Sequence, residues 1–280
     1  MLASSEMKNK FSVVIPAYNA EDTILEALNS IKNQDSLFAI KEIIVVDDGS
    51  KDKTVGAVES FMKKNPSLNV ILIRIPNSGP SKARNAGIQR ASSEWIAFLD
   101  SDDKWNFNKI TLQLSVIERN PGCTFVSGSS NLIKGGYGKH LYDNVYKISV
   151  LQYLYKSRVS TPTVVALKAS IEEAGLYSEH MRYAEDENLF MKLIHDGGAY
   201  YINDELVHLN DKPVYGTSGL SANLRSMHKG RVLNIKESKS LGYINFSTYV
   251  LLIVVERIKY ARRIIKTKLR KLNKKDGANK

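Results

Sequence analysis

Three carboxylates lie within four positions of this chain, directly after a short apolar run. Asp100, Asp102 and Asp103 follow residues 95–99, whose apolar side chains are typical of a buried strand. Like charges a few ångströms apart resist ionising together, and a hard divalent cation relieves this repulsion because it prefers carboxylate oxygens as ligands. The residue types alone fit two interpretations equally well, a metal site or an acidic turn that points into water.

The elements that precede these acids alternate between strand and helix. Short apolar runs predict buried strands, and apolar residues at helical spacing predict the helices between them. The predicted order is strand 11–16, helix 22–33, strand 42–46, helix 54–64, strand 70–75, helix 81–90 and strand 95–99. This β-α-β-α-β order predicts an α/β fold with a doubly wound parallel sheet and right-handed crossovers.

Polar side chains follow three of these strands. They are Tyr18 and Asn19 after the first strand, Asp47 and Asp48 after the second, and the carboxylates that begin at Asp100 after the fourth. In a doubly wound sheet, ligands bind beyond the carboxyl ends of the strands, where the loops gather. We therefore expect the three loops to converge on one binding site.

The chain after residue 103 predicts further elements with a looser pattern. Helices are expected at residues 109–119, 149–155 and 187–196, strands at 125–128 and 199–202, and a loop or hairpin at the glycines of 135–138. No repeat or low-complexity linker divides residues 10–230. We therefore expect one large domain over these residues.

Five segments along residues 11–230 resemble the family 2 glycosyltransferases, which are nucleotide-sugar enzymes of the GT-A fold. They are residues 13–19 (VVIPAYN), 44–50 (IVVDDGS), 81–88 (SKARNAGI) and 98–103 (FLDSDD), and the pair Glu185 and Asp186. Any one of these segments is a weak signal, but five in the right order and spacing are specific. The resemblance implies a GT-A-like, Rossmann-like, mostly parallel sheet flanked by helices.

The resemblance also implies a set of nucleotide-binding residues, namely Pro16, Tyr18, Asn19, Asp47, Asp48, Arg84, Asp100 and Ser101. The ring of Tyr18 would stack on a uracil-type base, and the Asp48 carboxylate would accept a hydrogen bond from the base. A simple Asp-Gly turn is the alternative for Asp48. Arg84 would contact phosphate or hold the acidic loop. Lys82, where the family often has a small residue, is expected to be a solvated helix position.

The Asp-x-Asp motif of that family is matched by the segment that begins at Asp100. The match implies that Asp102 binds Mn²⁺ or Mg²⁺, that Asp100 binds the ribose or the same metal, and that Asp103 is a weaker neighbour. The metal would neutralise the charge that builds on the leaving nucleotide. Some relatives complete the metal site with a histidine, for which the candidates here are His208 and His228.

Inverting sugar transfer needs a general base that deprotonates the acceptor hydroxyl. Asp186 matches the catalytic position of the family's Glu-Asp motif, and Glu185 is its supporting neighbour. Acids at a helix N-terminus are also favoured by the helix dipole without any catalysis, but the upstream nucleotide loops favour the catalytic interpretation. Residues 215–221, which contain two glycines, are expected to form a mobile loop that closes on the donor.

The net charge of +11 is concentrated near the C-terminus. Residues 246–255 are strongly apolar, but a helix that spans a bilayer needs about 20 apolar residues. Between Glu256 and Lys275, ten lysines and arginines face a single acid. Residues 246–275 therefore predict an interfacial helix on the inner membrane surface, and a helix packed on the domain with a disordered basic end is the alternative. Sparse aromatic residues argue against nucleic acid as a partner.

Cysteine usage and the N-terminus both point to the cytosol. The single cysteine, Cys123, excludes an internal disulfide and suggests a reducing compartment. Residues 1–10 are polar and lack the apolar run of a secretory signal. We therefore expect a cytoplasmic protein that is peripheral on the cytoplasmic face of the membrane.

Together these features predict a metal-dependent inverting glycosyltransferase that takes a sugar from a nucleotide-diphosphate donor. A UDP-sugar is the first candidate for this donor. The acceptor would be a hydroxyl of a glycan or of a lipid-linked acceptor in cell-surface polysaccharide synthesis. Residues 10–105 would bind the donor, residues 106–230 the acceptor, and residues 231–280 would form a basic helical extension. The alternatives are a nucleotidyltransferase and a noncatalytic nucleotide-sugar-binding protein at the membrane. No motif specifies the donor sugar, the acceptor or the oligomeric state.

Overall fold

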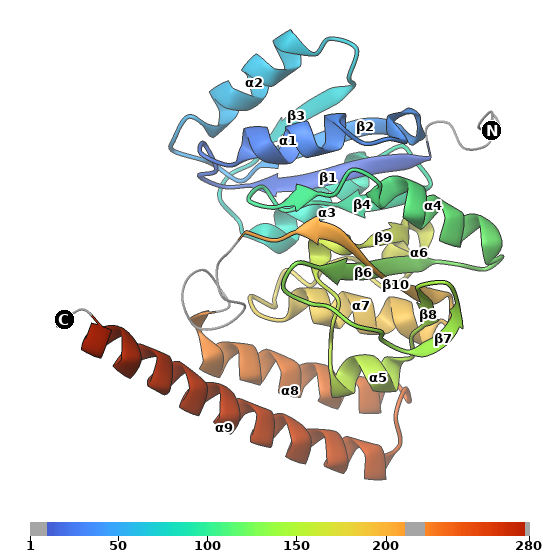
Figure 1. Cartoon of the computed structure of the whole chain (residues 1–280), viewed down its shortest axis with the longest axis vertical. Helices are drawn as coiled ribbons and strands as arrows, with labels where there is room; N and C mark the ends of the chain where they lie inside the picture. The colour runs from blue at the N-terminus through green and yellow to red at the C-terminus, as the bar shows by residue number, and fades with distance from the viewer. Residues whose placement is uncertain (1–9, 211–221, 278–280) are drawn as a thin grey trace.

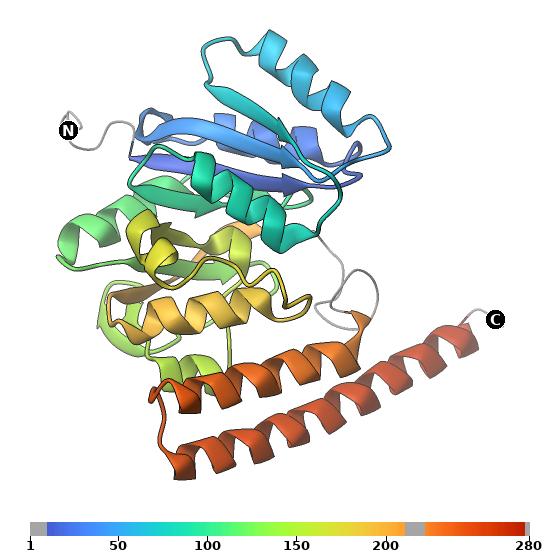
Figure 2. The ribbon, with the colours of Figure 1, turned by 180° about the vertical axis from the view of Figure 1, so that it is seen from behind.

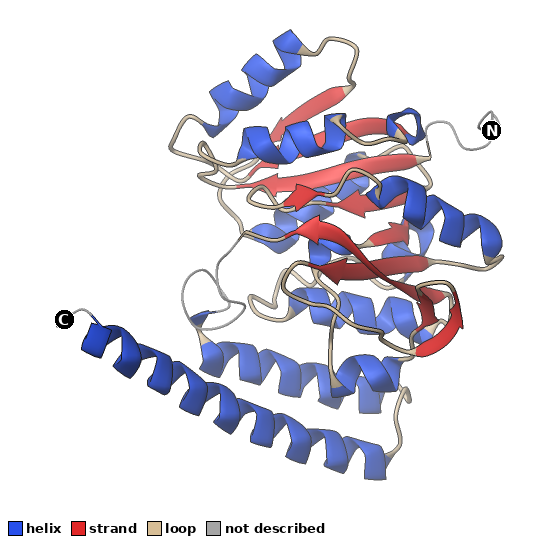
Figure 3. Cartoon of the chain, viewed as in Figure 1, coloured by secondary structure: helices blue, strands red, loops and turns tan. Residues whose placement is uncertain are grey.

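A ten-stranded mixed sheet runs through the computed structural model, which describes residues 10–210 and 222–277 (Figure 1, Figure 3). Its strands lie in the order β3-β2-β1-β4-β9-β6-β10-β8-β7, and β5 pairs with β10. The strands are β1 (Phe11–Ala17), β2 (Ile40–Asp47), β3 (Val70–Arg74), β4 (Trp95–Phe98), β5 (Lys104–Trp105), β6 (Phe125–Ser130), β7 (Lys139–Tyr142), β8 (Val145–Lys147), β9 (Val165–Leu167) and β10 (Ala199–His208). The helices that flank the sheet are α1 (Ile24–Lys32), α2 (Thr54–Lys64), α3 (Pro80–Arg90), α4 (Lys109–Arg119), α5 (Val150–Tyr155), α6 (Lys168–Glu173) and α7 (Glu185–His195).

The N-terminal half of the sheet is parallel, as the alternation of strands and helices predicts. β1 pairs in parallel with β2 and β4, and β2 pairs in parallel with β3. Val13 and Ile15 of β1 face a core that includes buried side chains of α1, α2 and α4, whereas Val14 faces a core that includes those of α3 and α7. Because helices cover both faces, these strands are apolar on both sides, and the loops at their carboxyl ends remain accessible to ligands.

The second half of the sheet combines both directions. β9 runs antiparallel to β4 and β6, and β10 is parallel to β6 but antiparallel to β5 and β8. The strands predicted at residues 125–128 and 199–202 are confirmed as β6 and β10, and the helices predicted at 109–119, 149–155 and 187–196 are confirmed as α4, α5 and α7. The sequence pattern does not predict β5 and β9, which contain only two and three residues. Such short segments become strands through their neighbours, not through propensity.

Two long helices, α8 (Leu224–Ser240) and α9 (Phe246–Gly277), follow the sheet and lie side by side (Figure 1, Figure 2). The helix predicted for residues 246–275 is confirmed as α9. α8 packs on α7 and runs continuously across residue 230, where the predicted domain division lies. Gly230 permits the close approach, because a Cβ atom there would lie 2.4 Å from the Tyr183 carbonyl oxygen. Among residues 10–210 and 222–277, no helix has the length and apolar character needed to cross a membrane.

Candidate active site

A cavity of about 680 Å³ opens beyond the carboxyl ends of β1, β2 and β4. Its walls include six of the eight residues predicted to bind the nucleotide: Pro16, Tyr18, Asp48, Arg84, Asp100 and Ser101. The three loops that were expected to converge therefore do so. The cavity has the size of a small-molecule site and a mixture of apolar and polar walls.

The first loop offers an exposed ring on a fixed backbone. Tyr18 is 50% exposed at the cavity. Asn19 ties this loop to the next one, because its backbone N–H donates to Ser50 Oγ at 2.9 Å and its side-chain oxygen accepts from the Lys51 N–H at 2.8 Å. Asn19 has a φ of 48°, in the left-handed region that asparagine tolerates better than most residues. The ring of Tyr18 can therefore stack on a ligand without rearrangement of the loop.

The second loop is organised by Asp48. Its Oδ1 accepts a hydrogen bond from the Ser78 N–H at 2.7 Å, and its Oδ2 accepts one from the Gly79 N–H at 2.8 Å. Asp47 is buried, and its Oδ1 lies 3.4 Å from the Ser50 backbone nitrogen. Asp48 thus lines the cavity and also holds the segment that leads into α3. A carboxylate has more lone pairs than these two bonds use, so it can also accept from a ligand.

Arg84 on α3 connects the cavity with α7. Its Nη2 donates to Asp100 Oδ1 at 2.8 Å, and its Nη1 lies 3.5 Å from Glu185 Oε1. The Arg84 Cζ lies 5.3 Å from the centre of the Tyr177 ring. Burial opposes the positive charge, but the Asp100 carboxylate, Tyr177 and Glu185 outweigh it and raise the pKa of Arg84 above its ordinary value. A charged guanidinium therefore joins the acidic loop to the first turn of α7.

The acidic loop turns its three carboxylates to different surroundings. Asp100 faces Arg84, and Asp102 is exposed. Asp103 is buried, and its Oδ1 accepts a hydrogen bond from the Asn210 N–H at 2.9 Å. The loop is thus fastened at both ends, and Asp102 is the carboxylate most open to solvent.

Asp100 and Asp102 have the hard oxygen donors that Mn²⁺ or Mg²⁺ prefers. Among the side chains that the structure describes, those of residues 10–210 and 222–269, no group of three His, Cys, Asp or Glu is arranged to hold a metal ion. Mg²⁺ is commonly bound by one or two carboxylates, with water and substrate phosphates completing its shell. The residues present fit this shared mode and do not form a cage made of protein ligands alone.

The two candidate histidine ligands lie in different places. His208 ends β10, and Asn210, two positions later, donates to Asp103 of the acidic loop. His228 lies on α8, where its Nδ1 is 3.2 Å from Glu256 Oε1. The structure therefore brings His208 towards the acidic loop and places His228 with the C-terminal helices.

The first turn of α7 carries three successive acids, Glu185, Asp186 and Glu187. Glu185 lies beside Arg84; burial and the neighbouring Asp186 raise the pKa of Glu185 to about 7, although Arg84 opposes the shift. Glu187 is held by Arg231 of α8, with Oε1 2.6 Å from Nη2. Asp186 is half-buried between them, and its Oδ1 accepts from the Glu187 N–H at 2.7 Å. Through Arg84 and Arg231, the acids of this turn thus connect the wall of the cavity with α8.

Backbone strain precedes this acidic turn. Ala184 has a φ of 58° and a ψ of 30°, a left-handed conformation that costs a residue other than glycine about 1–3 kcal/mol. The Asn234 side chain donates to the Ala184 carbonyl oxygen at 2.9 Å and helps to hold this conformation. Strained residues of this kind cluster at functional sites.

The sequence analysis did not predict two parts of the cavity wall, which are Asn77, Ser78, Gly79 and Pro80 in one segment and Glu179, Met181 and Arg182 in the other. The first segment follows β3, so the rule that selected the other loops would also have selected it. The second lies between α6 and α7 and carries no motif, although Arg182 adds a second guanidinium to the wall. The loop predicted at residues 215–221 lies outside the described residues.

Comparison with known proteins places this geometry in context. Residues 12–167 match the family model described as Glycosyl transferase family 2. The chain is 31% identical over 211 residues to the poly(ribitol-phosphate) β-N-acetylglucosaminyltransferase TarS of Staphylococcus aureus, a match that covers 74% of this chain and 35% of TarS. It is 30% identical over 192 residues to the UDP-Glc:α-D-GlcNAc-diphosphoundecaprenol β-1,3-glucosyltransferase WfgD of Escherichia coli, covering 69% of this chain and 72% of WfgD. The chain thus spans about a third of the length of TarS.

Two solved structures share the fold. TarS 1–349 in complex with UDP-GlcNAc has a TM-score of 0.65 at 22% identity, over 87% of this chain and 70% of that one. The mannosyltransferase PcManGT of Pyrobaculum calidifontis, in complex with GDP-Man and Mn²⁺, has a TM-score of 0.65 at 18% identity, over 89% and 69%. These likenesses confirm the predicted fold class of a GT-A-like sheet flanked by helices. Neither the family match nor these relatives support a nucleotidyltransferase or a noncatalytic sensor.

Proposed function

Because the chain belongs to glycosyl transferase family 2, we propose that it is an inverting glycosyltransferase. It moves a sugar from a nucleotide-diphosphate donor, a UDP-sugar, to a hydroxyl of a glycan or lipid-linked acceptor in cell-surface polysaccharide synthesis. The observation that carries this proposal is the buried Arg84 guanidinium between Asp100 and Glu185. It joins a cavity of nucleotide size to a helix end that carries the candidate base, and sugar transfer requires both.

The names of the relatives support the substrate classes. TarS is named for transfer of N-acetylglucosamine to poly(ribitol-phosphate), and WfgD for transfer of glucose from UDP-Glc to a sugar on diphosphoundecaprenol. Both names describe a glycan or a lipid-linked acceptor that contains phosphate. A nucleotide-sugar donor and an acceptor of one of these kinds are therefore the substrates we propose.

In the proposed donor complex, each loop has a separate task. Tyr18 stacks on the base, and Asp48 accepts a hydrogen bond from it while it holds the segment before α3. Pro16 and Ser101 line the cavity, whereas Asn19 and Asp47 act through the shape of their loops. Arg84 is already bound to Asp100, so of its two predicted tasks we favour holding the acidic loop.

Metal dependence belongs to the same proposal. Asp102 would hold Mn²⁺ or Mg²⁺, with Asp100 as a second oxygen donor and His208 as the better placed of the two histidines. When bound, the metal neutralises charge on the departing diphosphate. Asp100 shares its charge with Arg84 at 2.8 Å, so Asp102 is the principal protein ligand.

Asp186 is the proposed general base, and Glu185 is its supporting neighbour. Two adjacent carboxylates do not ionise independently, and burial raises the pKa of Glu185 to about 7. A proton held by Glu185 near neutral pH reduces the negative charge beside Asp186. Asp186 can then accept the proton of the acceptor hydroxyl as that oxygen attacks the anomeric carbon.

The C-terminal helix supports a proposal about location. The outward side of α9 exposes apolar side chains at helical spacing: Leu251, Val254, Ile258, Ile265 and Leu269. Exposed cations flank this stripe, with Arg257 and Lys268 on one side and Arg262 and Lys266 on the other. This pattern suits a helix that lies on an anionic membrane surface, so we place residues 246–275 on the cytoplasmic face of the membrane. Residues 10–105 then bind the donor, residues 106–230 the acceptor, and residues 231–280 form the extension.

Substitution of the proposed base tests the reaction. Asp186→Asn is expected to lower kcat for transfer by about 10²–10⁴-fold, while the affinity for UDP stays within about twofold. Asp196→Asn is the matched control, because Asp196 lies exposed at the opposite end of α7 and the charge change is the same. The assay uses a panel of nucleotide sugars with Mn²⁺, and UDP binding is measured by calorimetry. Full turnover in Asp186→Asn, or a wild type that neither binds UDP nor turns over any donor, would overturn the proposal.

A further inference from the structure

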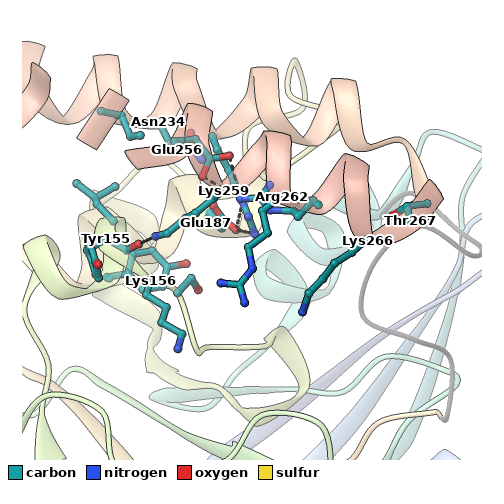
Figure 4. Close-up of a pocket in the computed structure, with 15 residues that line it drawn as sticks. Tyr155, Lys156, Glu187, Asn234, Glu256, Lys259, Arg262, Lys266 and Thr267 are labelled. Atoms are coloured by element: carbon teal, nitrogen blue, oxygen red, sulfur yellow. Dashed lines mark hydrogen bonds and ion pairs between the residues drawn. The ribbon is translucent and has the colours of Figure 1, made fainter. Parts of the chain in front are cut away.

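A second cavity, of about 600 Å³, lies between α7, α8, α9 and the end of α5 (Figure 4). It shares no lining residue with the donor cavity. Its lining includes the apolar side chains of Leu154 and Ile235 and the ring of Tyr155. None of the residues proposed for donor binding or for proton removal lines this cavity.

Positive charge dominates the walls of this second cavity. The cations that line it are Lys156, Arg231, Lys259, Arg262, Arg263 and Lys266. The acids that line it are Glu187 and Glu256. The walls therefore carry a clear excess of positive charge in a concave space.

Both acids are already engaged. Glu187 Oε1 lies 2.6 Å from Arg231, and Glu256 lies 2.9 Å from Arg263 and 3.2 Å from His228. Among the remaining cations, Lys259 receives some charge compensation from Glu256. Among the side chains of residues 10–210 and 222–269, no ion pair is formed by Lys156, Arg262 or Lys266. Figure 4 shows Lys156 and Lys266 extending towards the same side of the cavity.

The pKa of Lys259 reflects the local excess of positive charge. Burial lowers its pKa, and the nearby Arg263 and Arg231 lower it further, although Glu256 opposes them. Its ammonium group lies 4.3 Å from the centre of the Tyr155 ring and donates to the Tyr155 carbonyl oxygen. An anion in the cavity would relieve this repulsion.

The position of the cavity connects it with the reaction. Glu187 lines it, and Asp186, the proposed base, is the preceding residue on the same turn. Glu185, on that turn as well, reaches Arg84 of the donor cavity at 3.5 Å. One turn of α7 therefore lines the second cavity through Glu187 and contacts a wall residue of the donor cavity through Glu185. The proposed base is thus the chain neighbour of a residue that lines the second cavity.

We propose that this cavity binds a phosphate group of the acceptor, as a phosphodiester or as a diphosphate. The inference rests on the proposed glycosyl transfer, for which it names the acceptor class. Phosphate oxygens take charge-assisted hydrogen bonds from several lysines and arginines at once, which matches the unpaired cations of the cavity. A neutral glycan would leave those cations uncompensated.

Two charge variants of α9 test the site. Arg262→Gln/Lys266→Gln removes two cations from the cavity, and the control Arg257→Gln/Lys268→Gln removes two from the other flank of the same helix. All four side chains are exposed, so both variants should fold. The probe is inorganic pyrophosphate, titrated calorimetrically in metal-free buffer, because binding of a diphosphate in the donor cavity is proposed to need the metal.

Wild type and control should bind pyrophosphate with equal affinity, and the cavity variant should bind it at least about tenfold more weakly, or about 1.4 kcal/mol. Equal binding by both variants, or no binding by the wild type, would overturn the inference. Transfer kinetics give a second readout. The KM for a phosphorylated acceptor should rise about tenfold in the cavity variant alone, while donor hydrolysis without acceptor stays unchanged.

The same measurements separate the two proposals. A wild type that binds pyrophosphate in the cavity but hydrolyses no nucleotide sugar would refute the proposed glycosyltransferase activity but not the phosphate site. Donor hydrolysis by the wild type, together with equal pyrophosphate binding by the two variants, would refute the phosphate site alone. Competition distinguishes the sources of phosphate: displacement by glycerol 3-phosphate supports a soluble polyol phosphate, and tighter displacement by a short-chain isoprenyl diphosphate supports a lipid-linked acceptor.

Discussion

Replacement of Arg84 by methionine should destabilise the protein by about 3 kcal/mol at pH 7.5. Removal of one partner from a buried ion pair costs about 3–5 kcal/mol, because the other charge is left without compensation. Arg84 has two partners, Asp100 with 29% of its side chain exposed and Glu185 with 10%. Water can reach Asp100, and Glu185 can take up a proton, so we expect the lower end of that range.

Urea denaturation followed by tryptophan fluorescence measures this loss, because Trp95 and Trp105 are both buried. Lys82→Met is the control, since Lys82 is exposed two positions earlier on α3, and it should change stability by less than about 0.5 kcal/mol. In an Asp100→Asn/Glu185→Gln background, Arg84→Met should cost at least about 1 kcal/mol less than in the wild type. A loss below about 1 kcal/mol in the wild type, or an equal loss in both backgrounds, would refute the assigned ion pairs.

Three further predictions concern pH and the membrane. The stability of Glu185→Gln relative to the wild type should rise by up to about 3 kcal/mol between pH 4.5 and 7, because the folded wild type keeps the Glu185 proton to about pH 7; a constant difference in urea unfolding would contradict this. Burial lowers the pKa of Lys109, so raising the pH from 7 towards 10 should stabilise the wild type relative to Lys109→Met by up to about 1.4 kcal/mol per pH unit. A stability difference that does not change with pH would show that Lys109 is charged in the folded protein. Ile258→Glu/Ile265→Glu should reduce co-sedimentation with anionic vesicles by at least about tenfold, and undiminished binding would exclude the outward side of α9 as the contact.

The parallel half of the fold could be predicted because its signals are local. β1 and β2 are unbroken apolar runs that end in turn residues, and the rule for doubly wound sheets then brings their loops together. β9 could not be predicted in this way. It has three residues, and it becomes a strand because β4 and β6 supply hydrogen bonds on both sides.

Individual contacts in the site lie beyond such patterns. The Asp48 carboxylate accepts from Ser78 and Gly79, about 30 positions away, and no periodicity predicts which backbone groups it meets. The basic residues of α9 were predicted to face anionic lipid, and their helical spacing shows which of them share one side of that helix. It does not show that α5 and α8 close one side into a cavity, because that depends on helix packing.

The hydrogen bonds between the loops around the donor cavity have a thermodynamic consequence. Asn19 joins the loop after β1 to the loop after β2, and Asp48 joins the latter to the segment after β3. None of these bonds involves a ligand. The chain therefore loses the conformational entropy of these three loops when it folds, and donor binding has less ordering left to oppose it.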